Sequence, residues 1–134
     1  RLFYGMSSKT AMEKHSGAKL PRIFYVNWFR KNDQGKFMWP GYGENCRVLK
    51  WVFDRCQGEA SAHDTAIGRL PHVEDIDVHG LNIDKNDLKQ LLHVDKEAWL
   101  QELPSLREHL NVFADKMPNV LRDELNSLEK RLRA

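Results

Sequence analysis

The chain has 134 residues, of which 41% are apolar and 30% charged, and its formal net charge is +2. This proportion of apolar to charged residues is ordinary for one globular domain with a core. Because no run of about 18 apolar residues occurs, the sequence predicts no membrane span. The charge is unevenly distributed, since residues 1–58 carry a net +7 and residues 59–134 a net −5. The basic N-terminal half is suited to binding an anionic ligand, or the two halves could simply attract each other.

Residues 1–21 show little apolar periodicity, and their Ser, Gly and Pro residues predict an N-terminal loop or linker. The chain does not open on Met or on the apolar stretch of a signal peptide, which indicates a piece of a longer protein. Its two cysteines, Cys46 and Cys56, have the spacing of neither a disulfide framework nor a metal site. We therefore expect two reduced thiols in a cytoplasmic protein.

Residues 22–30 are β-branched and aromatic almost throughout, and they predict a strand covered on both faces. The Asn, Asp and Gly residues of 31–36 favour a hairpin turn, after which residues 37–39 are expected to form a short second strand. The Pro-Gly-Tyr-Gly run at 40–43 predicts a tight turn that ends this strand.

The rest of the chain is predicted to be mainly helical. A helix over 44–57 buries a face of Val48, Leu49, Val52 and Cys56, widened by Trp51 and Phe53, and ends at Gly58. Residues 59–83 look irregular, and a short helix over 84–92 begins with Asp84 as its cap. A longer helix over 95–115 is kinked or broken at Pro104, and Pro118 begins the last helix. The stripe of the last helix is Leu121, Leu125, Leu128 and Leu132. The fold class is therefore α/β, with short strands or a hairpin followed by several helices.

Aromatic residues crowd around the two turns of residues 23–47; they are Trp28, Phe29, Phe37, Trp39 and Tyr42. Aromatic faces stack on a purine base, and a side-chain amide both donates and accepts, so Asn45 after the Gly-Tyr-Gly turn could contact the edge of the base. The same aromatic residues could instead be ordinary core, an alternative that periodicity favours for the two tryptophans more than for Tyr42.

Two stretches of this region resemble the C-terminal signature of GTP-dependent phosphoenolpyruvate carboxykinases, which reads close to hVNWFRK and GKFLWPGFGENSRVL. The matching residues are 24–31, FYVNWFRK, and 35–49, GKFMWPGYGENCRVL. Weaker matches lie at 1–5, 18–21 and 67–71, and the two C-terminal Leu-rich helices match in position and character. The chain departs from the family at Tyr42, where Phe is usual, at Cys46, where Ser is usual, and throughout residues 6–17.

The resemblance implies the C-terminal part of the nucleotide-binding lobe of an enzyme that converts oxaloacetate and GTP to phosphoenolpyruvate, GDP and CO₂ in gluconeogenesis. By that resemblance Phe29, Phe37 and Tyr42 form an aromatic box for guanine, Asn45 contacts its edge and Trp28 supports the pocket. The backbone of residues 42–45 would also contribute. The implied guanine-binding set is Trp28, Phe29, Phe37, Tyr42, Gly43, Glu44 and Asn45.

The parent enzyme implied by the resemblance uses Mn²⁺ and Mg²⁺, but its metal ligands, phosphate loop and substrate arginines lie upstream of the matched region. We therefore expect no catalytic and no metal-binding residue in this chain. Residues 22–134 are expected to form one guanine-nucleotide-binding segment, which would be inactive alone. Its partners would be GTP or GDP and the remainder of a monomeric parent, with no nucleic acid and no membrane.

Three alternatives stay open at this point. The chain could be a free-standing guanine-nucleotide module whose phosphate contacts come from its basic residues, Arg22, Arg30, Lys31, Lys36 and Arg47. Residues 84–134 could be a helical interaction module. The parent could also be a related carboxykinase that uses another phosphoryl donor.

Overall fold

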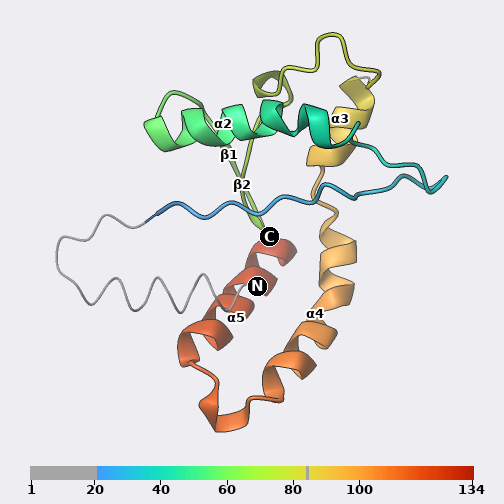
Figure 1. Ribbon diagram of the computed structural model, residues 1–134. Helices are drawn as coiled ribbons and strands as arrows, with labels where there is room; N and C mark the ends of the chain where they lie inside the picture. Colours follow the sequence, from blue (N-terminus) through green and yellow to red (C-terminus); the bar gives the residue numbers. More distant parts are fainter. Residues whose placement is uncertain (1–20, 84) are drawn as a thin grey trace. The chain divides into compact units, whose positions relative to one another are not determined.

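The computed structural model describes residues 21–83 and 85–134 (Figure 1). The chain divides into two compact units, one up to Glu59 and one from Ala60 to Ala134, and each is described by itself. The loop predicted for residues 1–21 lies, apart from Pro21, outside the described residues, and so does the predicted cap Asp84. None of the helices in the described ranges has both the length and the apolarity that a membrane span requires.

The apolar segment 22–30 is not a strand, so this prediction is wrong. The segment nevertheless alternates in exposure as an extended chain does. Its half-buried residues include Phe24, Val26 and Trp28. Its exposed residues include Ile23, Tyr25 and Phe29, which are 67%, 85% and 74% exposed. The residue pattern correctly identifies an extended apolar segment, but a strand also needs a neighbouring backbone to pair with, and no described segment forms a ladder with this one.

One side of this segment contacts the helix that follows in the first unit. The ring of Phe24 meets Trp51 edge-to-face, with centroids 6.0 Å apart, and the Arg22 guanidinium donates to the carbonyl oxygen of Arg55. The predicted turn at 31–36 is confirmed, because Asn32 Oδ1 accepts from the backbone N–H groups of Gln34 and Lys36 at 3.1 and 3.0 Å. The predicted strand 37–39 is wrong beyond its first residue, since only a single bridge joins Lys31 and Phe37.

The helix predicted for 44–57 is confirmed as α2 (Asn45–Gln57), preceded by the 3₁₀ turn η1 (Tyr42–Glu44). Gly58 ends it in the left-handed conformation, with φ 86°, where a residue without Cβ is favoured. The buried face is centred on Trp51, which is 6% exposed. The predicted face is wrong for Leu49, Phe53 and Cys56, which are exposed, because no segment of this unit within residues 21–59 covers that side.

In the second unit a two-stranded antiparallel hairpin falls within the stretch predicted to be irregular. β1 (His63–Thr65) pairs with β2 (Gly68–Leu70), and Thr65 lies opposite Gly68. The strands are short and polar, so they lack the apolar alternation by which a strand is recognised. Two side-chain contacts accompany this pairing: an exposed Asp64–Arg69 ion pair across the strands at 3.0 Å and a Thr65 hydroxyl that donates to the carbonyl oxygen of Gly68 at 2.6 Å.

The other elements of the second unit are helical: η2 (Val73–Asp75), α3 (Lys85–Leu92), α4 (Lys96–Asn111), η3 (Ala114–Lys116) and α5 (Asn119–Arg133). α4 runs through Pro104 without a break. Pro104 lies on the exposed side of α4, where water can satisfy the carbonyl that loses its helical hydrogen bond. The long helix predicted for 95–115 ends earlier, and η3 takes up its last residues.

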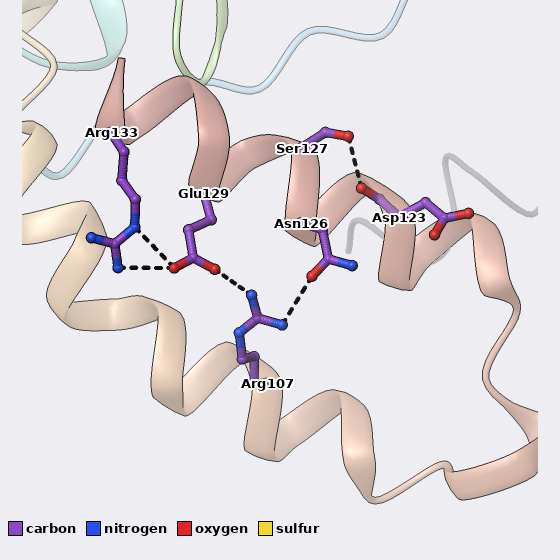
Figure 2. A network of polar contacts seen from close by, with 6 residues as sticks. All are labelled: Arg107, Asp123, Asn126, Ser127, Glu129 and Arg133. Atoms are coloured by element: carbon purple, nitrogen blue, oxygen red, sulfur yellow. Dashed lines mark hydrogen bonds and ion pairs between the residues drawn. The ribbon is translucent and has the colours of Figure 1, made fainter.

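α4 and α5 pack against each other and against the β hairpin around a small core of Ala66, Leu103, Leu125 and Leu132. Polar contacts tie the same two helices along one side (Figure 2). Arg107 of α4 donates to Asn126 at 3.1 Å and also to Glu129, which accepts from Arg133 as well. Arg131 Nε donates to the carbonyl oxygen of Ala66 at 2.9 Å, which fastens α5 to the hairpin.

Candidate functional site

Phe29 and Phe37, two of the predicted site residues, meet at the base of the turn in the first unit. Their ring centroids are 6.2 Å apart with an interplanar angle of 64°. Both rings are more than half exposed, and Lys31 Nζ stands 4.8 Å from the centroid of Phe37. The pair therefore presents aromatic surface beside a positive charge, a combination suited to a flat base that carries phosphates.

Asn45, the predicted reader of the base edge, is held by a residue outside the predicted set. Trp39 is 6% exposed, and its indole N–H donates to Asn45 Oδ1 at 2.9 Å. Sequence reasoning counted Trp39 among the aromatic residues but did not connect it with Asn45. The available signal was chemical, because the N–H of a buried indole usually finds an acceptor and the Asn45 amide follows six residues later, across a tight turn.

Two backbone groups that the resemblance assigned to the ligand are occupied within the turn. The N–H of Asn45 donates to the carbonyl oxygen of Tyr42, and the N–H of Glu44 donates to that of Gly41 at 3.1 Å. The Glu44 carboxylate accepts from Arg47 Nε at 2.7 Å. Around this turn, therefore, the Asn45 side chain is better placed to donate to a ligand than the backbone N–H groups of Glu44 and Asn45.

Tyr42 lies apart from the other predicted aromatic residues. It is 94% exposed, follows Gly41 at φ 117°, and shares no ring contact with another residue in the described ranges. Trp28 is half-buried, and the Gly43 carbonyl accepts from the Cys46 thiol at 3.5 Å. The structure thus brings together Phe29 with Phe37 and Trp39 with Asn45. It does not bring three rings into a sandwich, which would need nearly parallel faces with a gap for the base.

Two open surface hollows of the second unit lie around other residues. Two shallow hollows of about 540 and 480 Å³ share His63, Leu92 and His93 in their walls, and no predicted site residue lines either. The rings of His63 and His72 lie 4.9 Å apart. Within residues 21–83 and 85–134, no group of three or more His, Cys, Asp or Glu side chains is arranged to hold a metal ion.

Charged pairs shift the pKa values of two groups. On α2, the hydrogen bond from Lys50 Nζ to Asp54, 2.6 Å long, raises the pKa of Lys50. On α5, hydrogen bonds from Arg133 and Arg107 lower the pKa of Glu129 below its ordinary value. Both groups belong to ion pairs on helices, Lys50 with Asp54 on α2 and Glu129 with Arg107 and Arg133 on α4 and α5.

The chain matches known proteins over nearly its whole length. Residues 4–131 match the family described as the phosphoenolpyruvate carboxykinase C-terminal P-loop domain. The chain is 47% identical over 123 residues to the phosphoenolpyruvate carboxykinase (GTP) of Neocallimastix frontalis, which covers 91% of this chain and 20% of that protein. It is 46% identical over 116 residues to that of Chlamydia pneumoniae, covering 86% and 19%. With the Treponema pallidum protein it shares 48% identity over 114 residues, covering 84% and 18%. It thus spans about a fifth of the length of these relatives.

Proposed function

This chain belongs to the GTP-dependent phosphoenolpyruvate carboxykinase family, and on that premise we propose that it supplies the guanine-binding part of such an enzyme. The parent would convert oxaloacetate and GTP to phosphoenolpyruvate, GDP and CO₂, as in gluconeogenesis, in the cytoplasm. The chain contains no Gly-x-x-x-x-Gly-Lys-Ser/Thr phosphate loop. In this proposal the phosphates and the Mn²⁺ and Mg²⁺ ions are held by residues outside the chain.

The observation that carries the proposal is the pairing of exposed aromatic surface with an oriented amide in one short segment. Phe29 and Phe37 offer faces for stacking, worth about 1–3 kcal/mol per base, and Lys31 adds a cation beside them. Asn45 adds a polar group for the base edge. Tyr42, with Gly43 and Glu44 in the same turn, would close over the other face of the base on binding, and Trp28 would support the pocket from behind.

The exposed apolar residues of the first unit support the second part of the proposal, that the remainder of the parent packs here. The outer residues of segment 22–30, with Leu49 and Phe53 of α2, are each more than half exposed. The segment is extended but has no strand partner among residues 21–83 and 85–134. A sheet supplied by the remainder of the parent would pair the backbone of this segment and cover its apolar side chains. The parent is proposed to act as a monomer.

Calorimetric titration with GDP and ADP tests this function on the 134-residue chain and on the complete protein that contains it. We expect GDP to bind more tightly than ADP, and Tyr42→Ala and Asn45→Ala each to weaken GDP binding about tenfold, since each removes one stacking or hydrogen-bonding group. Asn111→Ala, at the exposed end of α4, is the control and should leave binding unchanged. If the complete protein bound neither nucleotide, or if neither site variant differed from the control, the proposed function would be wrong.

A further inference from the structure

We propose that Trp39 determines the selectivity of this site for guanine over adenine, by fixing which end of the Asn45 amide faces the base. The inference rests on the proposed function and adds a positioning residue to it. Its basis is the hydrogen bond from the Trp39 indole N–H to Asn45 Oδ1, 2.9 Å long.

The chemistry of the donor settles the orientation of the amide. An indole nitrogen can only donate a hydrogen bond, so the atom it contacts must be an acceptor. In the Asn45 side chain only the oxygen accepts, whereas the nitrogen carries two N–H donors. The 2.9 Å contact therefore fixes Oδ1 toward Trp39 and directs Nδ2 away from it. Trp39 is only 6% exposed, so packing fixes the position of the indole. The Asn45 amide must therefore orient to the indole.

The group left for a ligand is thus a donor. Within residues 21–83 and 85–134, Asn45 Nδ2 contacts no acceptor, so its two N–H groups are available. The position-6 group of guanine is a carbonyl oxygen, which accepts, and that of adenine is an amino group, which donates. An amide fixed in this orientation pairs with the oxygen and leaves two donors facing each other when adenine is present. An amide free to rotate could present its oxygen to adenine instead.

A second buried tryptophan in the same unit shows that packing alone does not require such a bond. Trp51 is also 6% exposed, and its Nε1 is buried without a hydrogen-bond partner among the described residues. The ring of Trp51 meets that of Phe24, and within the described residues its N–H has no bond to Asn45. It therefore serves as a matched control: Trp→Phe removes a buried indole N–H at either position, but only at position 39 does the change release an amide.

The test compares the unsubstituted complete protein with its Trp39→Phe and Trp51→Phe variants, titrated with GDP, IDP and ADP. IDP keeps the position-6 oxygen of GDP but lacks the 2-amino group. We expect Trp39→Phe to reduce the ratio of the ADP to the GDP dissociation constant by about tenfold or more, the size of one discriminating hydrogen bond. The ratio of the IDP to the GDP dissociation constant should stay unchanged, because the proposed contact of the Asn45 amide is with position 6, which both nucleotides share. Trp51→Phe should alter neither ratio.

A further variant covers the case in which Trp39→Phe does not fold. Asn45→Asp keeps an oxygen for the Trp39 N–H but replaces the two donors with a second acceptor, so the preference should shift from GDP toward ADP. Failure of the unsubstituted protein to bind GDP would overturn the proposed function and this inference together. GDP selectivity that survives in a folded Trp39→Phe variant, or that falls equally in Trp51→Phe, would overturn the inference and leave the proposed function standing. Where Trp39→Phe does not fold, GDP selectivity that survives Asn45→Asp would do the same.

Discussion

Leu132 lies three residues from the C-terminal end of the described chain, where helices usually fray, yet it is 2% exposed in the core between α4, α5 and the β hairpin. Leu132→Ala removes about three methyl or methylene groups at roughly 0.8 kcal/mol each and leaves a cavity, for a total loss of about 3 kcal/mol. The second unit has about 75 residues, which corresponds to a stability of about 4–11 kcal/mol. The substitution should therefore remove a large part of it and lower Tm by about 12–24 °C.

The assay is urea unfolding followed by circular dichroism at about 222 nm, where helices dominate the signal, with a thermal scan alongside. Val120→Ala is the control, because Val120 lies on the same helix but is 58% exposed, and its loss should be within about 0.5 kcal/mol. A loss at Leu132 no larger than that of the control would refute the reasoning. It would mean that the last turn of α5 frays in solution and that the core does not extend to it.

Two further predictions concern charged groups of the same unit. Arg133 and Arg107 lower the pKa of Glu129 in the folded protein. The ion pairs of Glu129 therefore stabilise the fold fully at a pH above its ordinary pKa of 4.5. They lose this contribution as the pH falls through the lowered pKa. The difference in unfolding free energy between the unsubstituted protein and Glu129→Gln should thus shrink below that pH, and a difference that is constant with pH in urea titrations would contradict this. Asp95 Oδ1 accepts from Ala98 N–H at 3.0 Å at the start of α4; Asp95→Ala should cost about 1 kcal/mol by the same assay. Asp95→Asn keeps the acceptor and should cost less, and equal losses would count against the capping role.

The candidate site was predictable in its composition and only partly in its geometry. The segment 23–47 contains every residue that the structure brings together, and the similarity of 24–49 to one family is visible without coordinates. The contact between Phe29 and Phe37 depends on the turn between them, which the Asn and Gly residues of the sequence predict. Whether Tyr42 completes an aromatic box stays a prediction, because its position depends on a ligand or on the remainder of the parent. The Trp39–Asn45 bond was missed, since a residue interpreted as core was not also considered as a donor.

What the sequence by itself determined is what forms through local contacts. The limits of α2 at Gly58 and of α5 after Pro118, and the turn after Lys31, depend on backbone hydrogen bonds within a few residues and on the conformations that Gly, Pro and Asn favour. Tertiary structure alone decided the rest. Segment 22–30 has the composition of a strand but no partner in the described chain, whereas the polar residues 63–70 become strands because a short turn pairs them and Arg131 fastens Ala66 to α5. Pairing and burial are properties of two segments at once, so no single stretch of sequence specifies them.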